Sequence, residues 1–162
     1  MARVYRVSFF GQPEISDMAC IEEKIKEHVR DMLTIFGHVR FLVCYGDEFG
    51  SLAAETVLKL REESEDINCI IYCVMPNITH CYDRDIQPYF NKFNNAIAYM
   101  EAIFNTPEES YRIANRCMVE DSDFVICYVD TGIRKGVAYR TMKYAEKLGK
   151  RVINIYERKK KK

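Results

Sequence analysis

The chain has 162 residues, of which 48% are apolar, so it can bury one core but is too short for two ordinary domains. It carries 24 basic and 24 acidic side chains, and residues 158–162 are all basic. Without those five, 19 basic side chains face 24 acidic ones, which predicts an acidic body and argues against nucleic acid as a partner. We therefore expect a single domain over residues 1–157 and a disordered basic tail over residues 158–162.

The spacing of apolar residues predicts that strands alternate with helices through the first 75 positions. Apolar side chains recur every three or four residues between Ile15 and Phe36, which is typical of a helix with one buried face. The run from Val39 to Tyr45 is almost wholly apolar, as in a strand covered on both faces. The predicted elements are strand 4–10, helix 15–36, strand 39–45, a helix capped by Ser51, and strand 67–75.

The second half of the chain begins with an ambiguous segment at residues 78–105. We favour a short helix followed by a strand at residues 97–100, and the alternative is a single helix across residues 88–104. Thr106 and Glu109 form a capping-box pattern around Pro107, which predicts the start of a helix. A strand at 124–129, a helix over 138–148 and a strand at 151–156 complete the pattern.

This alternation of strands and helices predicts the fold class. No β-hairpin signal joins consecutive strands, so the connections are crossovers and the sheet is mainly parallel. We expect an α/β Rossmann-like three-layer α/β/α sandwich with about six strands. In such folds the loops at the carboxyl ends of the strands surround a crevice, which is where we expect the ligand.

Four loops that contain glycine or proline leave the predicted strands and would meet at that crevice. They are residues 11–13, 46–50, 75–77 and 132–136. Bare backbone N–H groups at a following helix can hold a phosphate, although each loop taken alone can equally be an ordinary turn. The chain has neither a dinucleotide fingerprint after its first strand nor a phosphate-binding P-loop motif, so we expect no cofactor.

Cysteine and histidine usage gives further expectations. The seven cysteines are odd in number and several fall in apolar runs, which indicates free thiols. The three histidines, His28, His38 and His80, have no metal-ligand spacing, so we expect no metal site. The start lacks a signal peptide, and no apolar run approaches the roughly 18 residues of a membrane helix. We expect a cytoplasmic protein with no membrane partner.

Two blocks of sequence carry a family resemblance. Residues 114–129 read ANRCMVEDSDFVICYV and residues 136–145 read GVAYRTMKYA, with weaker matches at residues 7–11 and 46–54. Together they resemble the YpsA-like family of the SLOG superfamily, whose members are Rossmann-like domains related to the LOG phosphoribohydrolases. The resemblance implies a ligand derived from a nucleotide.

The resemblance and the loops together predict a set of site residues. Gly136 and the helix behind it would hold a phosphate, Thr141 would donate its hydroxyl group, and Arg116 would pair with an anion. The alternative for Arg116 is a salt bridge to Glu120, and the alternative for Asp130 is backbone capping. The full predicted set is Gly11, Gln12, Gly46, Phe49, Met75, Pro76, Arg116, Asp130, Gly136, Ala138, Tyr139 and Thr141.

Three departures from the family pattern bear on function. Gln12 and Pro13 follow the glycine of the first strand, where the family usually has a small residue or His-Arg. Val137 replaces the second glycine of a Gly-Gly pair, and Lys143 stands where the phosphoribohydrolases place a glutamate. Because cleavage of a glycosidic bond needs a placed carboxylate, we expect binding or sensing of a nucleotide-derived small molecule. One alternative is N-glycosidic cleavage with Asp123, Asp130 or Glu48 as the carboxylate, so enzyme activity stays open. The other is a protein-interaction module with a vestigial pocket.

Tyrosine and phenylalanine side chains on the predicted helix faces are also compatible with a homodimer.

Overall fold

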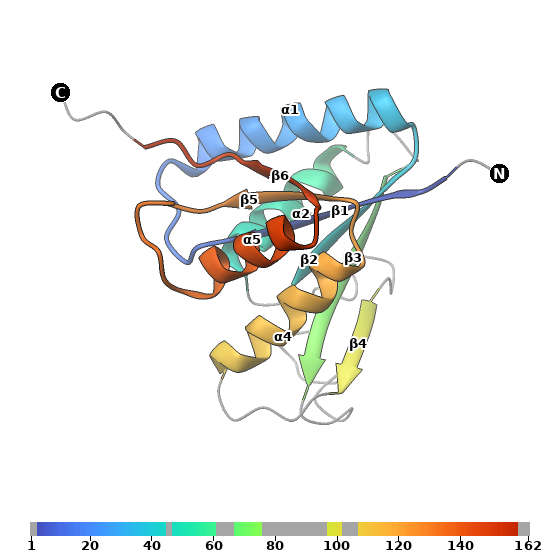
Figure 1. Ribbon diagram of the computed structural model, residues 1–162. Helices are drawn as coiled ribbons and strands as arrows, with labels where there is room; N and C mark the ends of the chain where they lie inside the picture. The colour runs from blue at the N-terminus through green and yellow to red at the C-terminus, as the bar shows by residue number, and fades with distance from the viewer. Residues whose placement is uncertain (1–2, 45–46, 61–66, 76–96, 102–106, 159–162) are drawn as a thin grey trace.

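The computed structural model describes residues 3–44, 47–60, 67–75, 97–101 and 107–158. Strands and helices alternate along this part of the chain (Figure 1). The elements are β1 (Tyr5–Gly11), α1 (Met18–Phe36), β2 (Val39–Cys44), α2 (Glu48–Leu60), β3 (Ile67–Met75), β4 (Ile97–Glu101), α4 (Pro107–Glu120), β5 (Phe124–Tyr128), α5 (Val137–Lys147) and β6 (Arg151–Asn154).

The strands form a single parallel sheet in the order β4-β3-β2-β1-β5-β6. The chain starts at β1, builds outward to β4, and then returns across β1 to place β5 on the other side. The order therefore reverses between β1 and β5, where Gly11 pairs with Tyr128. A reversal of this kind leaves a crevice beyond the carboxyl ends of the two strands.

Helices cover both faces of the sheet, because successive side chains of a strand point to opposite sides. On β1, Val7 and Phe9 pack with the apolar faces of α1 and α2. Phe10, on the same strand, packs instead with Ala114 and Met118 of α4. The predicted α/β class with a parallel sheet is confirmed, and the fold is Rossmann-like.

The start of α2 differs from the prediction. The helix begins at Glu48, so Ser51 lies inside its first turn and is not its cap. Asp47 is the cap, because its carboxylate accepts the N–H of Gly50 at 2.8 Å and its carbonyl accepts the N–H of Ser51 at 2.8 Å. This contact matters for function, since it fixes the Asp47 side chain beside the crevice.

The ambiguous segment is settled where the structure describes it. Residues 97–101 form β4 and pair in parallel with β3, so the alternative of one helix across 88–104 is wrong. The short helix expected before β4 and the Thr106 cap lie outside the described residues, as do tail residues 159–162. α4 begins at Pro107, in agreement with the expected start there.

Two further expectations concern thiols and membranes. Cys20, Cys44, Cys117 and Cys127, the cysteines whose side chains are described, are free thiols. Among the described helices, none combines the length and the apolar character needed to cross a bilayer.

Candidate functional site

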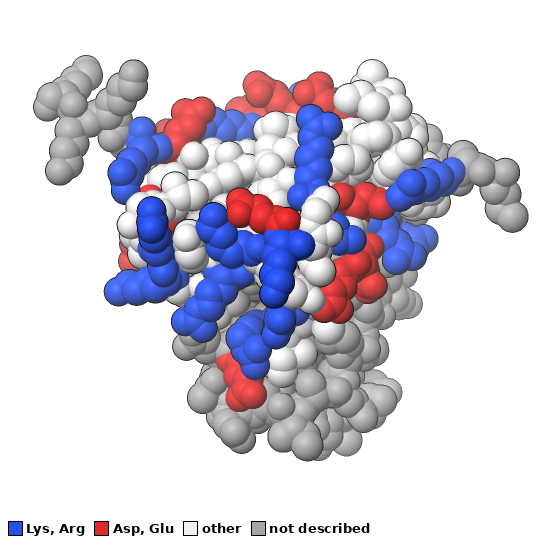
Figure 2. All heavy atoms as spheres, viewed as in Figure 1, with Lys and Arg blue, Asp and Glu red and all other residues white. Residues whose placement is uncertain are grey.

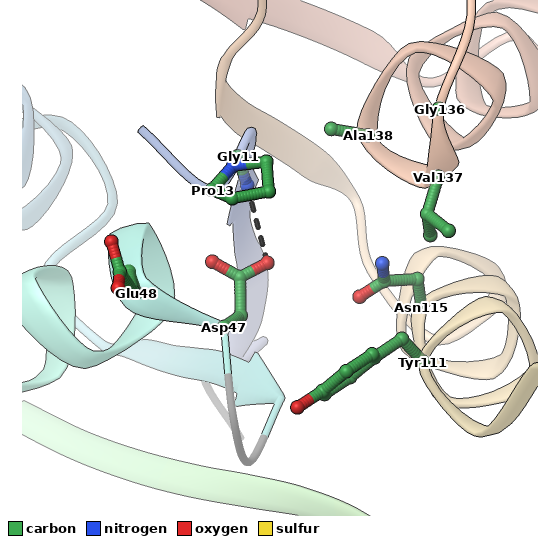
Figure 3. Close-up of a pocket in the computed structure, with 9 residues that line it drawn as sticks. All are labelled: Gly11, Pro13, Asp47, Glu48, Tyr111, Asn115, Gly136, Val137 and Ala138. Atoms are coloured by element: carbon green, nitrogen blue, oxygen red, sulfur yellow. Dashed lines mark hydrogen bonds between the residues drawn. The ribbon is translucent and has the colours of Figure 1, made fainter. Parts of the chain in front are cut away.

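A cleft of about 490 Å³ opens at the carboxyl ends of β1 and β2, beside the start of α5 (Figure 3). It lies at the reversal of strand order, where the fold is expected to place a ligand. α2 and the loop after β1 form one wall, and α4 and α5 form the other. The lining residues are Gly11, Pro13, Asp47, Glu48, Tyr111, Asn115, Gly136, Val137 and Ala138.

Asp47 is held by backbone donors on one side of this cleft. Its carboxylate accepts the N–H of Gly50 at 2.8 Å and the N–H of Gly11 at 3.2 Å. Although the residue as a whole keeps some exposure, burial of its carboxyl group raises the pKa of Asp47 to about 6. The backbone hydrogen bonds oppose that rise in pKa, and the negative charge of Glu48 adds to it.

Asn115 lies across the cleft from Asp47, on α4. Its side chain points into the cleft, and the residue is only 4% exposed. Its Oδ1 atom is the one buried side-chain oxygen or nitrogen in the described residues that has no hydrogen-bond partner. Buried polar atoms are nearly always paired in folded proteins, so this carbonyl is an acceptor directed at the cleft with no donor from the protein. Tyr111, one helical turn earlier, lines the same cleft and is 36% exposed.

The first turn of α5 separates the cleft from a second hollow of about 510 Å³. Gly136 caps the helix with φ at 94°, a conformation that favours glycine, and no side chain caps the helix there. Gln12, Asp130 and Tyr139 line the second hollow. The carboxylate of Asp130 is occupied by contacts within the protein, because it accepts the N–H of Gly132 at 2.9 Å and the hydroxyl of Tyr156 at 3.1 Å.

A third hollow, of about 450 Å³, lies between α4 and α5 and is strongly basic. Arg112, Arg116 and Arg140 line it together with Thr141 and Tyr144. The guanidinium of Arg116 lies 4.5 Å from the centre of the Tyr144 ring, which is a cation–π contact. Figure 2 shows Lys and Arg side chains gathered over the face that α4 and α5 form. We call this third hollow, with its five lining residues, the basic hollow.

The predicted site residues divide among the three hollows. Gly11, Gly136 and Ala138 line the cleft. Gln12, Asp130 and Tyr139 line the second hollow, and Arg116 and Thr141 line the basic hollow. These placements put eight of the predicted residues at surface hollows near α5, and their roles toward a ligand stay predictions.

Other predicted site residues have different positions or roles. Phe49 is fully buried and lines none of the three hollows. The hydroxyl of Thr141 donates to the carbonyl of Val137 at 2.7 Å, so the expected donor is already used within α5. Gly46 and Pro76 lie outside the described residues, and of Met75 only its place at the end of β3 is described.

Arg116 and the candidate carboxylates also behave differently from the expectation. Arg116 stacks on the ring of Tyr144, and the hydroxyl of Tyr144 donates to Glu120. Tyr144 therefore contacts both residues of the direct salt bridge that was considered as the alternative. Asp123 lies at the start of β5 and accepts the N–H of Arg6 at 2.9 Å, far along the strand from the crevice. Of the three carboxylates considered for catalysis, Glu48 is the one that lines the cleft.

Sequence reasoning missed Asp47, Tyr111 and Asn115 as site residues. Tyr111 and Asn115 are four residues apart, so they share one face of α4 and point to the same place. A polar amide at helical spacing from an aromatic residue was the available signal for this face. The helical pattern alone does not distinguish this face from one that is only exposed to solvent.

Comparison with known proteins adds one finding. No family model matches the chain, and no curated protein matches it. Among solved structures, the chain is similar to DNA processing protein A from Helicobacter pylori, a structure described for its single-stranded DNA binding mode. The TM-score is 0.65 with 16% sequence identity, over 97% of this chain and 67% of that chain. At this identity the likeness shows a shared Rossmann-like fold.

This finding corrects two predictions. We expected a nucleotide-derived small molecule as the ligand, with N-glycosidic cleavage or a vestigial pocket as alternatives, and we argued against nucleic acid as a partner. A structure of the same fold that binds single-stranded DNA contradicts those expectations. The charge argument does not exclude nucleic acid, because net charge averages over the whole surface, whereas Arg112, Arg116 and Arg140 gather in one hollow.

Proposed function

We propose that this protein binds single-stranded DNA on the face formed by α4 and α5. The observation that carries the proposal is the basic hollow, where three arginines and a tyrosine line one depression. The likeness in fold to a protein that binds single-stranded DNA supports it. The blocks at residues 114–129 and 136–145 support the further proposal that the chain is a YpsA-like member of the SLOG superfamily.

The chemistry of the basic hollow suits a single strand. Proteins that bind single strands combine cationic groups, which contact phosphates, with aromatic rings on which bases stack. Arg116 lies over the ring of Tyr144, and the Lys143 ammonium lies 5.7 Å from the ring centre of Tyr139. Two rings and two cations therefore lie close together along α5, at positions 139, 140, 143 and 144.

The arginines of the basic hollow are available for phosphates. Within the part of the chain that the structure describes, neither Arg112 nor Arg140 forms an ion pair. A guanidinium can contact one phosphate through two parallel N–H donors, and contact with several phosphates gives affinity without reading the sequence.

The test compares two double variants that lose the same charge. Arg116→Gln with Arg140→Gln removes two positive charges from the basic hollow, and Lys24→Gln with Lys59→Gln removes two from α1 and α2 on the other face of the sheet. Affinity for a fluorescent oligothymidine of about 20 nucleotides is measured by anisotropy at several salt concentrations. The hollow variant should bind about tenfold more weakly, and its salt slope should fall by about 1.4, because each phosphate contact contributes about 0.7.

The control variant should retain the affinity and the salt slope of the original protein. Equal loss in both variants would mean that net charge, and not the hollow, holds the strand, and would contradict the proposal. Absence of saturable binding to oligothymidine by the unaltered protein would contradict it outright.

A further inference from the structure

The cleft next to the basic hollow contains an acceptor that the protein leaves unpaired. Only 4% of the surface of Asn115 is exposed, and its Oδ1 atom has no hydrogen-bond partner among the described residues. Figure 3 shows this amide pointing across the cleft toward Asp47. An unpaired buried carbonyl is costly, and a ligand that brings a donor to it recovers that cost.

Asp47 provides a second acceptor that faces Asn115. The N–H groups of Gly11 and Gly50 fix its carboxylate, and each carboxylate oxygen accepts one of them. A carboxylate offers about four acceptor positions, so some remain for a ligand. The two sides of the cleft thus present acceptors, and the Asn115 amide adds its Nδ2 donor beside Oδ1. A fitting ligand presents N–H donors, with an acceptor next to one of them.

The charge of the cleft disfavours phosphate as that ligand. Its lining residues in the described part of the chain include Asp47 and Glu48, and none of these lining residues is Lys, Arg or His. A phosphate would meet like charges here, while the basic hollow on the neighbouring surface of α4 and α5 offers it arginines. On a DNA strand, the uncharged part that carries N–H donors is the base.

Among the bases, guanine fits this arrangement best. Its Watson–Crick edge carries two neighbouring donors, the ring N1–H and the 2-amino group, and its O6 acceptor beside N1–H can receive the Nδ2 donor of Asn115. Adenine and cytosine each carry one amino group beside a ring acceptor, and thymine carries one N–H between two carbonyls. The exposed ring of Tyr111 at the cleft provides a surface for stacking an unstacked base.

We propose that the cleft between Asp47 and Asn115 selects guanine within the bound single strand. This inference rests on the proposed function, because the basic hollow has to hold the phosphates of that strand. Phosphate contacts would supply most of the affinity and Asn115 would supply the choice of base.

The test uses oligothymidines of about 12 nucleotides that carry one central substitution. The central position is guanine, hypoxanthine, adenine or thymine, and hypoxanthine keeps the ring N–H of guanine but lacks its 2-amino group. The unaltered protein should bind the guanine strand about tenfold more tightly than the thymine strand, with the hypoxanthine strand between them. This series needs no variant, so it does not depend on the folding of a mutant.

Two variants then assign the preference to its source. Asn115→Leu should reduce the ratio of guanine to thymine affinity to within about twofold. Arg116→Gln with Arg140→Gln should weaken binding of both strands by similar factors and leave the ratio in place. Equal affinity for all four strands, with tight binding retained, would overturn the guanine inference and leave the proposed function standing. Absence of binding to every strand would overturn both.

Discussion

The cleft and the basic hollow share the same two helices but differ in chemistry. Tyr111 and Asn115 of α4 face the cleft, whereas Arg112 and Arg116, each one position later, line the basic hollow. One position along a helix turns a side chain by about 100°, so two adjacent stripes of α4 serve two surfaces. In the proposed complex with a single strand, the acidic cleft contacts a base and the basic hollow contacts phosphates.

The cleft depends on close contact between β1 and α2, and this contact gives the largest predicted effect. A Cβ atom on Gly11 would lie 2.6 Å from the Cβ of Phe49, which is fully buried and has no room to move. We expect Gly11→Val to lower the free energy of unfolding by about 3 kcal/mol, measured by urea denaturation. Gly37→Ala is the control, because a Cβ there meets no atom within 4 Å and the cost is backbone strain alone.

A second prediction concerns the pH dependence of stability. Burial raises the pKa of Asp47 to about 6 in the folded protein, above its ordinary value of 3.8. Folded protein therefore binds this proton more tightly than unfolded protein does, so the contribution of Asp47 to stability is full below pH 3.8 and is lost as pH rises through 6. Between about pH 7.5 and pH 5 the gain is about 1.4 kcal/mol.

Asp47→Asn isolates that contribution, because other carboxylates titrate in the same range. The difference in unfolding free energy between the original protein and Asp47→Asn should change by that amount across the two pH values. The Glu22→Gln variant serves as a control of opposite sign, since Lys59 lowers the pKa of Glu22. A pH-independent difference between the original protein and Asp47→Asn would contradict the assignment.

The unpaired amide of Asn115 predicts a smaller gain in stability. Asn115→Leu replaces a buried carbonyl that has no partner with an apolar side chain of similar size. We expect the unfolding free energy of the protein without DNA to rise by about 1 kcal/mol while the preference for guanine is lost. A loss of stability in this variant would show that Asn115 has a structural role in the folded protein.

The smallest predicted effect is on DNA affinity and comes from a variant in the basic hollow. Tyr144→Leu removes the ring on which the Arg116 guanidinium lies, and Tyr144→Phe keeps that ring but loses the hydroxyl that donates to Glu120. We expect DNA affinity to fall by about two- to fivefold in the leucine variant, because Arg116 is no longer oriented. Affinity of the phenylalanine variant should stay within about twofold of the original protein, as judged by anisotropy.

Much of the fold was predictable because burial on both faces leaves a strong pattern. The runs at 39–44 and 124–128 are apolar at nearly every position, since alternate side chains enter two different cores. The start of α2 was misplaced by four residues because Asp47 and Ser51 are both good caps, and only tertiary structure shows which one is used.

The site was less predictable because it is formed by side chains from several helices and loops that meet only in the folded protein. The isolation of Asn115 from donors depends on what α2, α5 and Asp47 place around the cleft, and no local sequence pattern records that. The basic hollow could not be predicted because its arginines come from two separate parts of the sequence. Arg112 and Arg140 are 28 positions apart and come together through the packing of α4 against α5.

The contact between Gly11 and Phe49 has a consequence for how these positions vary together. A glycine at the end of the first strand ordinarily suggests room for a bound phosphate. In this protein, Phe49 fills the space that a side chain at Gly11 would occupy. Positions 11 and 49 should therefore covary, with a side chain at the first tolerated where the second is small. A homologue with a side chain at position 11 and a small residue at position 49 would have a differently shaped cleft, and we expect it to prefer a different base.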